Sequence, residues 1–261
     1  MFDWVVDNYL NPAPEDVIRP LLRQIVEGTR YMHSKGICHA DMSLENTLVN
    51  SEHTQAFIID FGMALQMPTD GQGRRCKSVP DGRKAKRSYR APETYEGEAY
   101  DGVKVDVFSV GCMAFMMFTG IPPFDSATKS DPKFKKAVYR GDLEGLLEDY
   151  KMQPLPGPVV RLLKAMMAYE AKDRPLPEEL LEDPWFAPIE AVDEQQQQQQ
   201  QQQVRPAQVQ EPTVSSPQEL HGQEVIATQV QQGAAPADDA AVASAAPPAP
   251  ASAPARSRMG V

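Results

Sequence analysis

Apolar residues recur at helical spacing along most of the first 190 residues. After Pro14 they follow the i, i+3, i+4, i+7 pattern, which predicts an amphipathic helix that ends at Gly36. Residues 103–119 are apolar on nearly all sides, which predicts a buried central helix too short to span a membrane. Further helical patterns lie at 134–139, 158–169 and 178–181.

Three short runs favour strands instead. They lie at 37–38, 47–49 and 56–59, and a polar turn around 51–54 separates the last two. The pattern therefore predicts a mainly α fold with a few short β strands.

The end of the chain has a different composition. All 9 Phe, 2 Trp and 8 Tyr lie at or before Phe186, and nine consecutive glutamines occupy 195–203. A segment without aromatic residues buries too little apolar surface to offset the entropy of the chain. We expect a folded domain at 1–190 and a disordered tail rich in Gln, Ala and Pro at 191–261. The polyglutamine run is expected to be a solvated spacer, with binding of other proteins as the alternative.

Composition narrows the class of protein. The hydrophobic fraction of 41% is sufficient for a core, and 26 basic against 36 acidic residues give a net charge of −10. We therefore expect neither nucleic acid nor a membrane as a partner. Three scattered cysteines and no signal-peptide pattern predict a cytoplasmic protein. The basic runs at 74–77 and 83–87 resemble a bipartite nuclear-localisation signal, so the nucleus is the alternative.

Polar residues in this apolar frame form an ordered series. Residues His39–Asn46 have the pattern H-x-D-x-x-x-x-N, and Asp60-Phe61-Gly62 begins fourteen residues after Asn46. Ala91-Pro92-Glu93, Asp106 and Arg174 follow in that order. Each motif alone is weak, but the full set at these separations is very unlikely by chance.

With this series the sequence resembles the eukaryotic protein kinases over about residues 2–186. The resemblance is to the C-terminal lobe and to the serine/threonine branch near calmodulin-dependent-type kinases. It implies transfer of the γ-phosphate of ATP to hydroxyl groups of a protein substrate, with Mg²⁺ as the cofactor. Such chemistry needs positioning and neutralisation of charge more than covalent help from the protein.

The resemblance assigns roles to particular residues. Asp41 would be the catalytic base that accepts the hydroxyl proton, and Asn46 and Asp60 would bind Mg²⁺ together with the phosphate oxygens. Leu48 would lie under the adenine of ATP. Read without the resemblance, Asp41 is a turn aspartate and Asn46 a loop amide.

Other matches imply architecture. Glu93 and Arg174 would form a buried ion pair, and Asp106 would accept hydrogen bonds from the backbone of the catalytic loop. The ring of His39 would stack with that of Phe61. His33, by contrast, has no partner at ligand spacing, so we expect no special role for it.

Three positions depart from the family pattern. Ala40 replaces the arginine that usually pairs with an activation-loop phosphate, which puts activation by phosphorylation in doubt. Ser43 replaces the lysine that neutralises the transferring phosphate, and Glu45 supplies no cation in its place. Lys86 stands where the family usually has a threonine, three residues before Tyr89. We expect Lys86 to replace the missing charge; the alternative is a solvated basic run.

The sequence before residue 39 contains no G-x-G-x-x-G loop and no V-A-I-K strand lysine, both of which the family uses to bind ATP. We therefore expect a partial catalytic domain whose N-terminal lobe is missing, or a genuine single-lobe protein. Alone, this chain should bind Mg-ATP very weakly. Two functions remain open: a serine/threonine kinase, or a non-catalytic, pseudokinase-like binding module with the low-complexity tail as an interaction arm.

Overall fold

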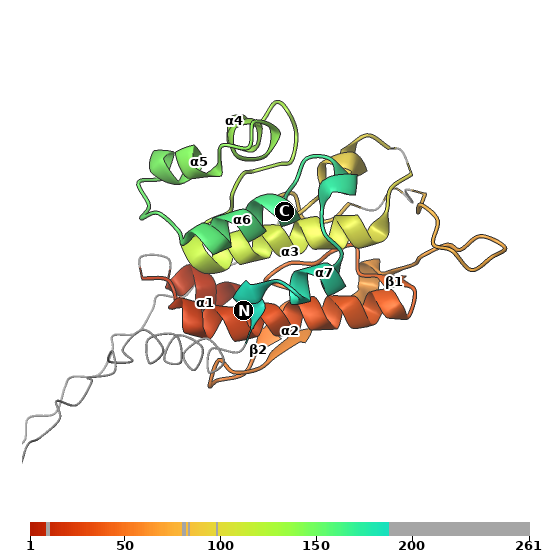
Figure 1. Ribbon diagram of the computed structural model, residues 1–261, viewed down its shortest axis with the longest axis horizontal. Helices are drawn as coiled ribbons and strands as arrows, with labels where there is room; N and C mark the ends of the chain where they lie inside the picture. Colours follow the sequence, from red (N-terminus) through yellow and green to blue (C-terminus); the bar gives the residue numbers. More distant parts are fainter. Residues whose placement is uncertain (9–10, 80–81, 83, 98, 188–261) are drawn as a thin grey trace, which may run out of the picture. The chain divides into compact units, whose positions relative to one another are not determined.

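The computed structural model describes residues 1–8, 11–79, 82, 84–97 and 99–187 (Figure 1). The chain divides into two units, Met1–Pro206 and Ala207–Val261, and every described residue belongs to the first. The predicted boundary near residue 190 and the predicted tail at 191–261 lie outside the described residues.

The described part is mainly α-helical, as predicted. Its helices are α1 (Phe2–Asp7), α2 (Glu15–Ser34), α3 (Gly102–Thr119), α4 (Pro132–Phe134), α5 (Leu143–Asp149), α6 (Gly157–Met166) and α7 (Pro177–Leu181). A π-helical turn, Lys135–Tyr139, continues α4. Short 3-10 turns lie at Phe61–Met63, Pro92–Tyr95, Ala171–Asp173 and Pro184–Phe186. Helix α5 was not predicted, although leucines at i, i+3 and i+4 follow its N-cap, Asp142.

The amphipathic pattern after Pro14 forms α2, with its apolar side in the core. The helix ends where Gly36 adopts a left-handed φ of 74°, a conformation that glycine takes without a steric penalty. The buried residues of α2 are Ile18, Leu21, Leu22, Ile25, Val26, Thr29 and Met32.

Helix α3 is the centre of the core and contacts both α2 and α6 (Figure 1). Every residue of α3 except Lys104 is buried, which explains why the segment is apolar on all sides. Among the described residues, α3 is the one helix long and apolar enough to cross a membrane. However, 89% of that 18-residue window is buried inside the protein. The side chain of Asp101 caps the helix by accepting a hydrogen bond from the amide of Val103.

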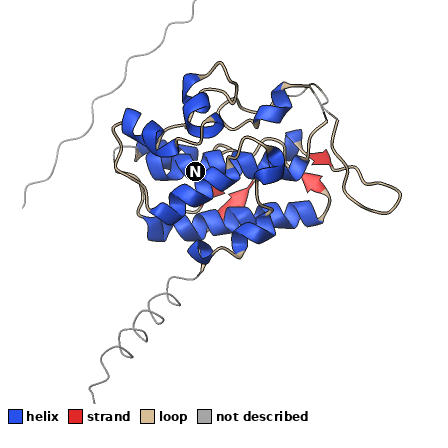
Figure 2. Ribbon diagram, turned by 45° about the horizontal axis from the view of Figure 1, so that its top comes forward, coloured by secondary structure: helices blue, strands red, loops and turns tan. Residues whose placement is uncertain are grey.

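Four short strands form two small antiparallel pairs beside the helices (Figure 2). Strand β1 (Ile37–Cys38) pairs with β4 (Leu65–Gln66), and β2 (Thr47–Val49) pairs with β3 (Ala56–Ile58). The first three strands were predicted, β3 being one residue shorter than expected, and the two-residue β4 was not. The loop between β1 and β2 carries the H-x-D-x-x-x-x-N motif, and the loop between β3 and β4 carries Asp60-Phe61-Gly62.

Candidate active site

One buried carboxylate, that of Asp106 in α3, holds the start of the loop at 39–46. The backbone amides of His39 and Ala40 donate to the two carboxylate oxygens of Asp106, at 2.8 and 2.9 Å. Asp106 lies in the first turns of α3 and is fully buried. A carboxylate that accepts two backbone hydrogen bonds fixes the direction of the loop, and this prediction is confirmed.

His33 shares the same carboxylate, contrary to expectation. Its Nε2 lies 2.9 Å from Oδ2 of Asp106, and its side chain is only 7% exposed. This pair could not be predicted from the sequence, because the two residues are 73 positions apart. The sequence did contain one signal. His33 lies on the last turn of α2, shortly before the loop that begins at His39, so its side chain is close to that loop.

The structure brings Asp41, Asn46 and Lys86 into one polar cluster. The side-chain nitrogen Nδ2 of Asn46 donates to Oδ2 of Asp41 at 2.8 Å. The ammonium nitrogen of Lys86 lies 2.8 Å from the same carboxylate oxygen and 3.2 Å from Oδ1 of Asn46. The backbone amide of Lys86 donates to Oδ1 of Asp41 at 3.1 Å. Two segments 45 residues apart in sequence therefore meet at Asp41.

Ser43 supplies no polar group to the face of this cluster. It is fully buried, and its hydroxyl accepts a hydrogen bond from the backbone amide of Asn46 at 3.2 Å. Among the described residues, Lys86 is the one whose charged group forms an ion pair with Asp41. The cation at this site thus comes from the segment before Tyr89 rather than from the loop at 39–46.

Asp60 lies beside the cluster because of the register of the β2–β3 hairpin. The ladder extends past Thr47 and Ile58, since the amide of Ile59 donates to the carbonyl of Asn46 at 2.9 Å. Asp60 follows at once, with a left-handed φ of 62°, and its Oδ1 accepts from the amide of Gly62. It is exposed, and within the described part of the chain no hydrogen bond joins it to Asp41 or Lys86.

Leu48 lies on the outer face of the same hairpin. It is 50% exposed, directly across from Phe57, which is 51% exposed. The pair forms an apolar surface next to Asn46. Leu48 is not part of the Asp41 cluster, but its position suits a flat apolar ligand.

The loop at 39–46 and the turn after Asp60 also contact through aromatic rings. The rings of His39 and Phe61 are 5.1 Å apart and tilted by 55°, and Nε2 of His39 lies 3.1 Å from the carbonyl of Ile59. The predicted contact is confirmed as a tilted rather than a parallel arrangement. It gives the two motif-bearing loops a shared support.

Comparison with known proteins decides the family. The model of the protein kinase domain family matches residues 2–186, which is most of the chain. The chain belongs to the protein kinase family.

Relatives of the chain carry kinase names, and some of these names specify serine/threonine kinases. It is 37% identical over 174 residues to a probable serine/threonine-protein kinase CHK1 homolog of Encephalitozoon cuniculi, covering 66% of this chain and 39% of the relative. It is 30% identical to sperm motility kinase Z of Mus musculus, covering 66% and 31%, and to maternal embryonic leucine zipper kinase of Danio rerio, covering 71% and 25%. The chain thus spans well under half the length of these relatives.

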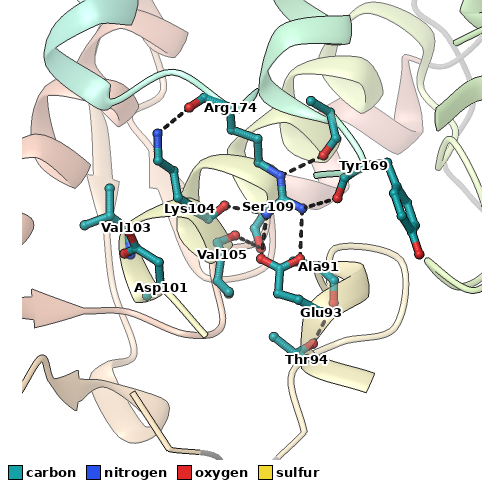
Figure 3. A network of polar contacts seen from close by, with 12 residues as sticks. Ala91, Glu93, Thr94, Asp101, Val103, Lys104, Val105, Ser109, Tyr169 and Arg174 are labelled. Carbon is teal, nitrogen blue, oxygen red and sulfur yellow. Dashed lines mark hydrogen bonds and ion pairs between the residues drawn. The ribbon is translucent and has the colours of Figure 1, made fainter. Parts of the chain in front are cut away.

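A second ion pair of this kinase domain lies at the opposite end of the segment that carries Lys86. Arg174 donates to both oxygens of Glu93, at 2.7 and 2.8 Å (Figure 3). The same two terminal nitrogens also donate to the carbonyls of Lys104 and Tyr169, and Nε of Arg174 donates to the carbonyl of Ala168. The side chain of Arg174 is fully buried, and the predicted architectural pair is confirmed.

Burial makes two of the three cysteines of the kinase domain poor nucleophiles. Burial, and next the charge of Asp106, raise the pKa of the Cys38 thiol well above its usual value. Burial likewise raises the pKa of Cys112. Both thiols therefore stay protonated at neutral pH and act as small core residues. Cys76 is exposed.

The oxygen donors of the kinase site fit Mg²⁺ better than a softer metal. The described residues contain no group of three or more His, Cys, Asp and Glu side chains able to hold a metal ion. Asn46 and Asp60 offer an amide oxygen and a carboxylate from adjacent ends of one hairpin. Mg²⁺ prefers a small number of protein oxygens completed by phosphate and water, so this donor set is appropriate.

Proposed function

We propose that this domain transfers the γ-phosphate of ATP to serine or threonine hydroxyls of a protein substrate. The proposal rests on one observation: Asp41 and Asn46, on a loop that Asp106 fixes, form a single hydrogen-bonded cluster with Lys86 from a separate segment. Family membership and the names of the relatives support this activity. Because the chain covers only part of those relatives, their own substrates are not assigned to it.

In this proposal Asp41 orients the substrate hydroxyl and accepts its proton. The carboxylate is 12% exposed, so a hydroxyl can approach it from solvent, while Asn46 and the backbone amide of Lys86 hold its orientation. Proton acceptance by a fixed carboxylate accelerates a reaction about 10²- to 10⁴-fold. Asp41 is thus the base of the reaction.

Lys86 supplies the positive charge that the loop at 39–46 lacks. Phosphoryl transfer gathers negative charge on oxygens next to the accepting hydroxyl. The ammonium group of Lys86 lies within 2.8 Å of Asp41, and a lysine side chain is flexible enough to remain near that carboxylate while contacting those oxygens. This contact would strengthen as charge develops in the transition state.

Asn46 and Asp60 would hold Mg²⁺, and Leu48 would contact the adenine of ATP. The metal, when bound, would neutralise charge on the phosphate groups. Asp60 has one carboxylate oxygen engaged by the amide of Gly62, and the second can face a metal. The half-exposed side chain of Leu48 gives the adenine an apolar surface on the same hairpin.

The substitution Asp41→Asn tests the proposal in the protein expressed from the complete gene. Phosphorylation of a general substrate such as casein should fall by about 10²-fold or more, since an amide cannot accept the proton. Asp125→Asn is the matched control, because the Asp125 side chain is 75% exposed and forms a long ion pair with Lys133 at 3.8 Å. Equal activity of wild type and Asp41→Asn would refute the assignment of the base. A wild-type protein without transfer that still captures partners would favour a binding module.

A further inference from the structure

A cavity of about 220 Å³ adjoins the Asp41–Lys86 pair. Ala40, immediately before Asp41, and Ala85, immediately before Lys86, both line it. Because consecutive Cα atoms are about 3.8 Å apart, this cavity begins roughly one residue away from the base on both segments. A substrate with its hydroxyl at Asp41 would have its neighbouring residues within reach of the cavity.

The charges around the cavity have one sign. Lys84 and Arg90 line it, and no Asp or Glu occurs among the described lining residues. This is notable in a chain with 36 acidic and only 26 basic residues. The described lining therefore carries two positive charges and no negative one, so the cavity favours negative charge.

Arg90 is held in place rather than free at the surface. Its Nε donates to the hydroxyl of Thr94 at 2.8 Å, and a terminal nitrogen donates to the carbonyl of the same residue. Its guanidinium lies 4.1 Å from the centre of the Tyr95 ring. A guanidinium fixed in this way loses little entropy when it binds a carboxylate with its other N–H groups.

The rest of the wall suits the short apolar stem of an acidic side chain. Met63, Leu65 and Val105 line the inner part, and Lys84 is exposed at the edge. An extended peptide advances about 3.3 to 3.6 Å per residue. A side chain one or two positions from the acceptor hydroxyl is therefore the one that reaches the cavity.

We propose that this cavity selects protein substrates with an aspartate or glutamate one or two positions from the phosphorylated residue. This inference rests on the proposed kinase activity and names its substrate class. Lys84 and Arg90 are the specificity-determining residues, and they act by binding the carboxylate while Asp41 binds the hydroxyl. The inner apolar wall holds the methylene groups of the same side chain.

Peptide sets with one acidic residue moved from three positions before to three positions after a single serine provide the test. With the protein from the complete gene, kcat/KM should be roughly fivefold to tenfold higher for an acid adjacent to or two residues from the serine than for glutamine there. The double variant Lys84→Gln/Arg90→Gln should remove this preference. Arg87→Gln should keep it, because Arg87 is exposed on the same stretch but does not line the cavity.

Binding separates failure of the inference from failure of the kinase activity. Fluorescein-labelled peptides with alanine in place of serine should bind the 261-residue chain more tightly when acidic, measured by anisotropy in low and high salt. If no peptide is phosphorylated but the acidic preference in binding persists and depends on Lys84 and Arg90, the activity fails while the cavity assignment holds. Equal binding of acidic and neutral peptides overturns the inference. Preference that survives the double variant, or competition by free phosphate or glutamate without any peptide preference, overturns it as well.

Discussion

Within the residues that the structure describes, two ion pairs join the segment at 86–93 to the rest of the domain, and they differ in exposure. In the Glu93–Arg174 pair, the side chain of Arg174 is 0% exposed and that of Glu93 is 21% exposed. In the Asp41–Lys86 pair, the corresponding values are 12% for Asp41 and 36% for Lys86. The two pairs thus differ in their cations: the side chain of Arg174 lies inside the core, whereas that of Lys86 reaches the surface.

The difference indicates which pair can exchange partners. Arg174 has its hydrogen-bond donors satisfied by Glu93 and by three backbone carbonyls, so moving it would leave several buried groups without partners. Lys86 contacts two side-chain oxygens and remains open to solvent, so it can rearrange at small cost. The buried pair fixes the segment, while the open pair is suited to chemistry.

The largest effect should come from breaking the buried pair. Arg174→Met should lower the free energy of unfolding by about 3 to 5 kcal/mol. The substitution leaves Glu93 without its ion-pair partner and leaves three backbone carbonyls without the hydrogen bonds that Arg174 donates. Urea denaturation followed by circular dichroism measures this change. Arg161→Met is the matched control, because it breaks the ion pair between Arg161 and Asp183. The side chain of Arg161 is 57% exposed, so the loss of stability should be no more than about 1 kcal/mol. Equal losses for both variants would contradict the comparison.

Removing the open pair should affect turnover more than stability. In the protein from the complete gene, Lys86→Ala should lower kcat by about tenfold to a hundredfold, with a much smaller change in the KM for ATP, because the contact is made mainly in the transition state. Steady-state kinetics on one substrate gives both constants. The free energy of unfolding should change by less than about 1 kcal/mol.

Two further variants sharpen this result. Ser43→Lys in the Lys86→Ala background should recover part of the lost turnover. The recovery should be incomplete, because Ser43 is buried and its hydroxyl accepts from the amide of Asn46. Arg87→Ala should be nearly neutral, since Arg87 is exposed. Full turnover of Lys86→Ala, or equal damage from Arg87→Ala, would show that Lys86 is only surface charge.

The smallest effect on stability is expected from replacing His33, which contacts Asp106. His33→Leu removes one of the groups that contact Asp106 and keeps a side chain of similar volume. The free energy of unfolding should fall by about 1 kcal/mol, the usual contribution of one hydrogen bond. Asp106→Leu should cost distinctly more, because it removes the acceptor of two buried backbone amides. Thermal unfolding of both variants measures the difference, and equal shifts would contradict a subsidiary role for His33.

The elements with a strong repeating pattern could be predicted from the sequence. The helical spacing of apolar residues after Pro14 corresponds to α2, which has 20 residues. The uniformly apolar segment corresponds to α3, which has 18 residues. Strand β4 could not be predicted in this way, because two residues are too few to show a period and their pairing with β1 depends on the tertiary fold. Helix α5 carried a signal in its leucine spacing that a closer analysis would have found.

The candidate site was predictable where a motif carries it and not where the fold assembles it. The contact between Lys86 and Asp41 was expected from the vacant cation position at Ser43, and the structure places the two groups together. His33 was wrongly given no role, since nothing in the sequence near it identifies Asp106 as its partner. The cavity beside Asp41 was not predicted either, because its walls come from stretches that are well separated in the sequence, from Ala40 to Ser109.

The bonds from His39 and Ala40 to Asp106 have a consequence for hydrogen exchange. Amide protons on surface loops usually exchange with solvent quickly, through small local openings. These two amides instead point inward to a carboxylate with no exposed surface, at the start of a helix buried along its length. Their protons can leave only when α3 itself separates from the loop. We therefore expect the amides of His39 and Ala40, just before Asp41, to exchange with the slow kinetics of the core, although they follow a two-residue strand.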